Sequence, residues 1–179
     1  VIRIALDAQE QGYLVTAAHE VFHYLEEKTP GQAAKLREYV CAELKKLMGA
    51  DAYEALVQER MAQYNTTDRL LAESEIAANG LFDVFRSESA VRRLVKTDRA
   101  LALKVRTALA EFLHELNKIV IKLSANREEI AALRGNAEAL QGIADRFDKA
   151  LNAAQGTKRT ARESGGRYSF AGVTAKTAD

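Results

Sequence analysis

The sequence predicts a mainly α-helical protein, and three of its properties support this class. Only one proline and ten glycines occur in 179 residues, and Ala, Leu, Glu, Lys and Arg, which favour helices, are abundant. Apolar residues also recur at intervals of three and four over long stretches, which is the period of one helix face. We therefore expect helices along most of the chain.

The composition limits the classes of protein to consider. Hydrophobic residues make up 47% of the chain, which is enough for a packed core. The 26 basic and 25 acidic residues nearly cancel, so we expect neither an anionic membrane nor a nucleic acid as partner. The single Cys41 favours a reducing compartment and a buried apolar position. The chain begins with Val1 rather than Met, so we expect further sequence upstream.

The stretch VTAAHEVFHYL, residues 15–25, contains the pattern His-Glu-x-x-His, formed by His19, Glu20 and His23. Two histidines four residues apart project from one side of a helix, so both imidazoles can bind one Zn²⁺ at about 2.0–2.1 Å. Glu20 then lies beside the metal and can act as general base towards an activated water. The alternative is a pair of surface histidines, but the uncharged flanking residues are more typical of a buried metal-bearing helix.

The helix that carries this pattern has predictable limits. Before it, the β-branched run Val1 to Leu6 predicts a short strand. The helix is expected from about Tyr13 to Lys28, because the residue before a proline avoids the helical region. Thr29, Pro30 and Gln32 then predict a capping box that starts the next helix.

The next two helices also have clear boundaries. One ends at Gly49, and another covers Ala50 to about Tyr64, followed by the cap cluster Thr66-Thr67-Asp68. The predicted buried face of the helix before Gly49 consists of Leu36, Val40, Leu44 and Leu47.

The helix expected from about Thr67 to Phe85 has a glutamate on its apolar face. At about 100° per residue, Glu75 shares this face, whereas Glu73 points away towards solvent. An unpaired buried carboxylate costs several kcal/mol, so Glu75 needs a metal, a core arginine or a helix end as partner. Beside the histidine pattern, Glu75 is the best third metal ligand, and Asn79, one turn later, can hydrogen-bond the outer nitrogen of a ligand histidine. The apolar residues on the face of Glu75 are Leu71, Ala78, Phe82 and Phe85.

These residues resemble a known arrangement. His19-Glu20-x-x-His23 followed by Glu75-x-x-x-Asn79 is similar to the HExxH plus ExxxD pattern of gluzincin-type zinc metallopeptidases, with Asn79 in place of the usual Asp. Asn79 can accept the imidazole N–H through its carbonyl oxygen but supplies no negative charge.

A closer resemblance covers longer segments. TAAHEVFHYLEEKTP and AESEIAANGLFDVF look like the HExxH metallopeptidase domain of large polyvalent proteins from phages and mobile genetic elements, and the tail Arg167 to Asp179 resembles a segment that recurs between their domains. The resemblance implies a zincin-like helical core, Zn²⁺ as cofactor and a peptide or protein substrate. It also implies neighbouring domains of a larger polyprotein as partners and a cytoplasmic location, in a bacterial host or encoded by a phage.

The residues alone leave two functions open. They support metal-assisted hydrolysis of a carbonyl compound, and the resemblance indicates that this compound is a peptide. The alternative is a non-catalytic helical interaction module with a structural or vestigial metal site. Tyr24, Tyr64 and His114 are candidates by type to stabilise an oxyanion, but their spacing selects none of them.

The last part of the helical sequence has a different pattern. After Ser87-Glu88-Ser89, apolar residues at alternating steps of four and three in residues 105–123 and 130–151 predict two helices that face each other. Ser124-Ala125-Asn126 breaks the run, and Asn126 with Glu129 can form a capping box, so we expect an antiparallel helical hairpin. His114 falls outside the apolar seam and is expected to be partly exposed.

These elements predict three regions. Residues 1–90 form a zincin-like metal-binding domain, truncated at its N-terminus, residues 91–154 a helical hairpin, and residues 155–179 a flexible linker or tail rich in Gly, Ser, Thr and basic residues. Three charges in that tail, Lys158, Arg159 and Arg162, are more typical of solvated sequence than of a nucleic-acid contact.

Overall fold

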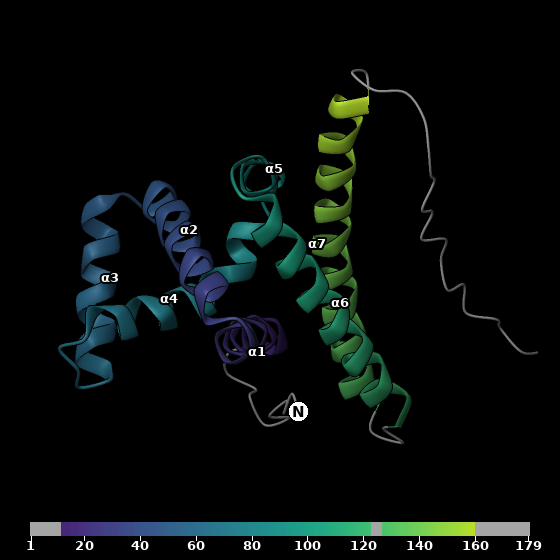
Figure 1. Ribbon diagram of the computed structural model, residues 1–179. Helices are drawn as coiled ribbons and strands as arrows, with labels where there is room; N and C mark the ends of the chain where they lie inside the picture. The colour runs from purple at the N-terminus through teal and green to yellow at the C-terminus, as the bar shows by residue number, and fades with distance from the viewer. Residues whose placement is uncertain (1–11, 123–126, 160–179) are drawn as a thin grey trace, which may run out of the picture.

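The computed structural model describes residues 12–122 and 127–159, which form seven helices and no strand (Figure 1). The predicted mainly α-helical class is therefore confirmed. The predicted strand at Val1 to Leu6, the predicted cap at Asn126 and the tail from residue 160 lie outside these ranges. Within them, no helix is both long enough and apolar enough to cross a membrane.

Helix α4 (Arg69–Phe85) lies at the centre of the N-terminal half and packs against α1 (Gly12–Lys28), α2 (Pro30–Met48) and α3 (Ala50–Gln63). Residues 74–78 of α4 are all buried, as expected for a helix covered on several sides. Gly80 allows α2 to approach, because a Cβ at this position would lie 2.7 Å from Cδ1 of Leu44. Side chains of α4 can therefore meet those of three other helices.

The start of α2 differs from the predicted capping box. The Thr29 hydroxyl donates to the carbonyl of Leu25, at 3.2 Å, and does not cap α2. Its own backbone N–H bonds the same carbonyl at 2.7 Å, so Thr29 completes the last turn of α1. Gln32 Oε1 is buried without a hydrogen-bond partner among the described residues, and Pro30 is at the first turn as expected. The capping-box prediction was wrong because the end of α1 takes the hydroxyl.

Other helix ends agree with the sequence. Gly49 ends α2 with φ of 90°, a left-handed conformation that glycine adopts without strain. Asp68 caps α4, since its side chain accepts hydrogen bonds from the backbone of Leu70 and Leu71. Two residues predicted on apolar faces are exposed, however: Leu47 at 68% and Leu71 at 42%. Leu47 lies in the last turn of α2 and Leu71 in the first turn of α4, so the predicted burial was wrong at these two helix ends.

The C-terminal half contains α5 (Glu88–Thr97), α6 (Arg99–Lys122) and α7 (Arg127–Arg159). Helices α6 and α7 run in opposite directions and pack together, and α5 packs against both (Figure 1). Helix α7 continues to Arg159, past residue 154 where the hairpin was expected to end. The predicted seam is buried at Val105, Leu109, Phe112, Leu116, Leu140, Ala144, Phe147 and Leu151.

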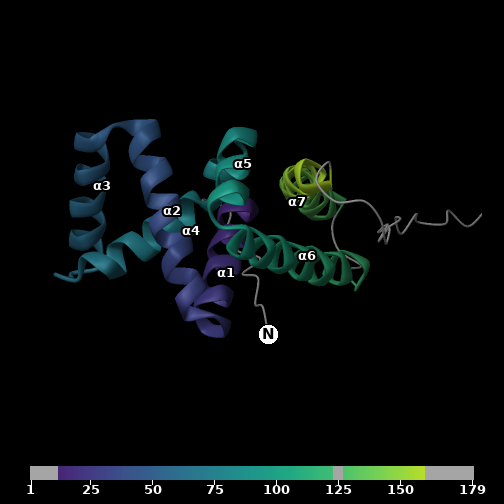
Figure 2. The same cartoon turned by 45° about the horizontal axis from the view of Figure 1, so that its top comes forward.

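Buried residues of both halves form one continuous core. Figure 2 shows α2, α3 and α4 on one side, α6 and α7 on the other, and α1 and α5 between them. Phe85 of α4 and Phe147 of α7, both fully buried, meet edge to face with ring centroids 5.0 Å apart. Whether residues 1–90 fold independently of the hairpin stays a prediction, but the two parts share this contact.

Candidate metal centre

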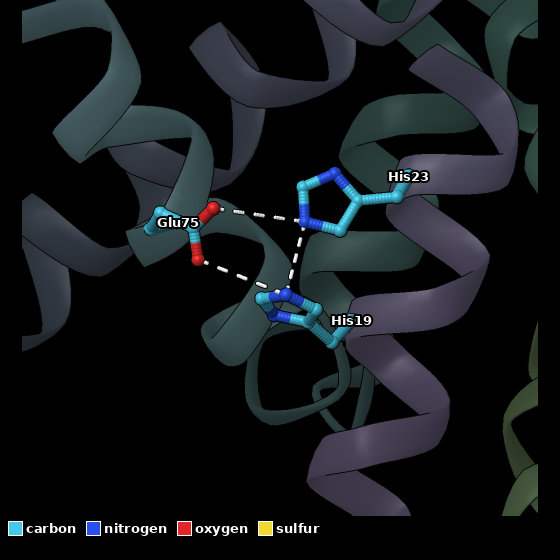
Figure 3. Close-up of side chains that lie close together, drawn as sticks. All are labelled: His19, His23 and Glu75. Atoms are coloured by element: carbon cyan, nitrogen blue, oxygen red, sulfur yellow. Dashed lines mark hydrogen bonds and ion pairs between the residues drawn. The ribbon is translucent and has the colours of Figure 1, made fainter. Parts of the chain in front are cut away.

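Three possible metal ligands meet where α1 packs on α4. His19 and His23 come from α1 and Glu75 from α4, and their polar atoms point towards one another (Figure 3). The two Nε2 atoms are 3.0 Å apart, and each lies 3.7 Å from a carboxylate oxygen of Glu75, His19 from Oε2 and His23 from Oε1. One ligand atom from each residue lies within 4.8 Å of the others.

The packing of α1 explains this position. One face of α1 enters the core, and the histidines lie at the border of that face, half-buried. The ring of Phe22 contacts His23 edge to face, with centroids 5.9 Å apart, so the imidazole has an apolar wall. The buried residues of this face are Ala18, Val21, Phe22 and Leu25.

The spacing fits a small ion bound by nitrogen and oxygen. Two ligand atoms at about 2.0–2.1 Å from a tetrahedral ion lie about 3.3–3.4 Å apart. The Nε2 atoms of His19 and His23 are closer than this, at 3.0 Å, and the nitrogen-to-oxygen distances are longer, at 3.7 Å. The histidines face different oxygens of Glu75, so its carboxylate would have to rotate for one oxygen to face both. Ligand geometry would therefore require small side-chain movements.

The cluster is open to solvent on its histidine side. The side chains of His19 and His23 are 32% and 36% exposed, whereas that of Glu75 is 11% exposed. Three protein ligands leave one position of a tetrahedral ion free, and the exposed side allows water or a small substrate group to reach it. A buried site with four protein ligands would not allow this.

Tyr64, at the end of α3, is a fourth polar residue of the cluster. Its hydroxyl donates to Oε2 of Glu75 at 2.9 Å, and this bond, together with some burial, raises the pKa of Tyr64. The other two oxyanion candidates lie elsewhere: Tyr24 donates to Glu111 on α6 at 2.8 Å, and His114 is exposed on α6. Of the three, Tyr64 is the one in contact with a ligand residue.

Glu20 and Asn79 lie beside the cluster. Glu20 directly follows His19 on α1, is half-buried, and makes no hydrogen bond or ion pair with a described residue. Asn79 lies one turn after Glu75 and is half-buried, but among the described residues it bonds neither histidine. The outer nitrogen of His23, Nδ1, is bonded to Glu26 instead, at 2.6 Å. The contact predicted for Asn79 is therefore not made with His23.

The contact of Glu26 with His23 was missed in the sequence, and Tyr64 was one of three candidates among which the spacing did not select. Glu26 follows His23 by three residues, a spacing that places both on one side of a helix, so the contact was open to prediction. The contact between Tyr64 and Glu75 has no comparable local signal, because it depends on how the turn after α3 leads into α4. Glu73, predicted to point outwards, is partly exposed and pairs with Arg69 at 2.9 Å.

Cys41 takes no part in this cluster. It is 8% exposed in α2, and its thiol lies 3.5 Å from the backbone carbonyl of Glu73. Burial raises the pKa of the thiol, which disfavours the nucleophilic thiolate. The predicted buried apolar position of Cys41 is confirmed.

No protein-family model matches this sequence, and comparisons with curated proteins and with solved structures also find no match. The fold and the cluster define a mainly α-helical protein with a His-His-Glu group that could hold a metal ion. Any more specific function has to be inferred from the chemistry of these residues and from the resemblance described above.

Proposed function

We propose that the chain is a zinc-dependent metallopeptidase in which His19, His23 and Glu75 bind the ion. The observation that carries this proposal is that one ligand atom from each residue lies within 4.8 Å of the others, although the residues come from two helices. Two histidines and a carboxylate with one open position are the donor set of several catalytic zinc sites, whereas structural sites normally have four protein ligands.

The proposed mechanism assigns the proton transfers to Glu20. Zn²⁺ at this site would lower the pKa of a bound water towards about 7 and polarise a substrate carbonyl. The Glu20 carboxylate, which no described cation pairs with, accepts a proton from the attacking water as the oxygen bonds to the carbonyl carbon. It then delivers that proton to the leaving amine nitrogen as the C–N bond breaks. The same carboxylate is thereby regenerated for the next turnover.

Tyr64 is the candidate for stabilising the oxyanion that develops on the carbonyl. Its hydroxyl is a donor, it lies 2.9 Å from Oε2 of Glu75, and the residue is 44% exposed, so it can turn towards a substrate. One hydrogen-bond donor to the oxyanion is worth about 10²–10³ in rate in other hydrolases.

The substrate class and the setting rest on the resemblance. A peptide or protein substrate, a place in a larger phage or mobile-element polyprotein and a cytoplasmic location are what the metallopeptidase domains of such proteins imply. The residues themselves support hydrolysis of a carbonyl compound in general, so an amidase would use the same groups.

A second candidate function is a non-catalytic helical interaction module with a structural or vestigial metal site. It is favoured by one observation: the Glu75 carboxylate already has polar neighbours without an ion, namely the Tyr64 hydroxyl at 2.9 Å and the two imidazoles at 3.7 Å. Such a cluster can tie α1, α4 and the end of α3 together without performing chemistry.

Two substitutions separate these functions. Glu20→Gln should keep zinc stoichiometry near that of the wild type but lower hydrolysis of a mixed peptide library by about 10²–10⁴, because Glu20 moves protons and does not hold the ion. His23→Ala should lose both zinc and activity. Glu27→Gln is the matched control, since Glu27 is exposed on the same helix and pairs with Lys28.

A structural site gives the opposite pattern. Glu20→Gln would then have no effect, whereas His23→Ala or a chelator would lower the melting temperature, because metal-binding energy contributes to folding. A wild-type protein that takes up no zinc and cleaves no peptide would contradict the metallopeptidase proposal.

A further inference from the structure

We infer that Glu26 is a positioning residue that fixes the tautomer and the orientation of His23 for metal binding, an inference that rests on the proposed metal centre. The observation is the 2.6 Å contact between Oε2 of Glu26 and Nδ1 of His23. Neither the HExxH pattern nor the ExxxN pattern includes this residue.

The chemistry of the contact determines which nitrogen carries the proton. An ionised carboxylate only accepts hydrogen bonds, so Nδ1 of His23 must be the donor. A neutral imidazole has one N–H, and the lone pair is then on Nε2. Nε2 is the nitrogen that faces the cluster, 3.0 Å from Nε2 of His19 and 3.7 Å from Oε1 of Glu75. Glu26 therefore selects the tautomer in which His23 can bind an ion inside the cluster.

The position of Glu26 also suits this role. It lies three residues after His23 on α1, so the helix backbone itself fixes the distance between the two side chains. Its side chain is 34% exposed and has no other hydrogen bond or ion pair with a described residue. The ring of His23 thus contacts Glu26 through Nδ1 and Phe22 edge to face.

Glu26 carries the negative charge that Asn79 lacks. A carboxylate on the outer nitrogen makes the ligand nitrogen more basic, and residues in this role typically change metal affinity by about 10–100-fold. Asn79 carries no charge, and it does not bond His23. The negative charge next to the outer nitrogen of His23 therefore comes from Glu26, which lies on the same helix.

The two histidines are not equivalent when both are neutral and no metal is bound. Because Nε2 of neutral His23 then accepts, Nε2 of His19 is the donor in the 3.0 Å contact. His19 must therefore move its proton to Nδ1 when an ion binds, whereas His23 already has the required tautomer. This asymmetry is a direct consequence of the bond to Glu26.

The test combines metal affinity with tautomer. Zinc dissociation constants are measured for the wild type, Glu26→Gln and Glu26→Ala, and long-range ¹H–¹⁵N correlation spectra of the metal-free proteins report which imidazole nitrogen is protonated. We expect Glu26→Ala to weaken zinc binding by about 10–100-fold and to shift His23 towards the Nε2–H tautomer. Glu26→Gln, which keeps an acceptor but no charge, should retain the Nδ1–H tautomer and bind zinc with intermediate affinity.

The control and the outcomes separate this inference from the proposed function. Glu27→Ala, one residue further along the exposed side of α1, should match the wild type in both measurements. Equal zinc affinity of the wild type and Glu26→Ala would overturn the role of Glu26 and leave the metal centre standing. An unchanged His23 tautomer in Glu26→Ala would also overturn it. A wild-type protein without zinc affinity would overturn the metal centre itself, and the positioning role with it.

Discussion

The hydroxyl of Tyr64 donates to Oε2 of Glu75 over 2.9 Å and joins the end of α3 to a proposed metal ligand on α4. No lysine or arginine among the described residues pairs with Glu75, so its polar neighbours are Tyr64 and the two histidines. The turn that follows Tyr64 has φ of 48° at Asn65, a left-handed conformation that asparagine adopts more readily than most residues. The loop sequence thus helps to hold a tyrosine against the cluster.

Removal of this hydroxyl should destabilise the metal-free protein. We expect Tyr64→Phe to lower the free energy of unfolding by about 1 kcal/mol, less than the usual value for a bond to a charged group, because water can reach the half-exposed Tyr64. Urea denaturation in the presence of a chelator measures the difference. Tyr24→Phe is the control, since its partner Glu111 is exposed and the expected change is smaller. Equal stability of Tyr64→Phe and wild type would mean that water replaces the bond fully.

The ion pair between Glu43 of α2 and Arg93 of α5 should contribute more to the free energy of unfolding than a surface pair does. The Glu43 side chain is 5% exposed and also accepts from Lys46 at 2.8 Å. Burial by itself would raise the pKa of Glu43. The hydrogen bonds from Arg93 and Lys46 outweigh the effect of burial, so the pKa lies below the ordinary 4.5. We expect Arg93→Met to destabilise the protein by about 2–3 kcal/mol, because a buried carboxylate loses its main partner while Lys46 remains.

A neighbouring arginine provides the control for this pair. Arg92 is exposed and pairs with Glu88 on the surface at 2.7 Å. Arg92→Met should change the stability by about 0.5 kcal/mol or less. Chemical denaturation of both variants at pH 7 gives the comparison, and similar values for the two would contradict the importance of burial at Glu43.

Stability should fall in acid partly because of Glu54. Its pKa is about 2, below the ordinary 4.5, chiefly because Arg69 donates hydrogen bonds of 2.8 and 2.9 Å to its carboxylate. A carboxyl group with a lower pKa in the folded state stabilises the fold above its unfolded pKa, and this contribution is lost as the pH falls through the folded value. We therefore expect the Glu54 contribution to disappear between about pH 4.5 and pH 2. Denaturation at a series of pH values should show a flatter acid dependence for Glu54→Gln and for Arg69→Met than for the wild type.

The contact between Phe85 and Phe147 should couple the two halves of the chain. We expect Phe147→Ala to cost about 3–5 kcal/mol, because it removes a fully buried ring from the core. Leu103→Ala, at a position 45% exposed on α6, should change the stability by about 0.5 kcal/mol or less.

The course of unfolding tests the coupling directly. Helix content and tyrosine fluorescence of the wild type should change in one coincident transition, since the two rings join α4 to α7. Two separate transitions would instead favour the predicted boundary at residue 90.

Much of the fold could be predicted because it depends on local spacing. The helices other than α5, the cap at Asp68 and the seam of α6 and α7 follow from periodicity and end signals within single segments. Helix α5 was not predicted as a helix separate from the hairpin of residues 91–154. The errors lie at helix ends. The hydroxyl of Thr29 bonds the end of α1 rather than the start of α2, and Leu47, in the last turn of α2, is exposed. A residue at a helix end has several possible partners, and its own sequence does not choose among them.

The candidate site, like the fold, has features that local spacing predicts and features that depend on how the helices pack. The common side of His19 and His23 and the inward direction of Glu75 could be predicted, because both depend only on the angular positions of residues on a helix. The packing of the helices, which the sequence does not show, brings these faces together and places Tyr64 against Glu75. Periodicity gives the direction of a side chain from its helix axis, but the distance between side chains on different helices depends on how those helices pack.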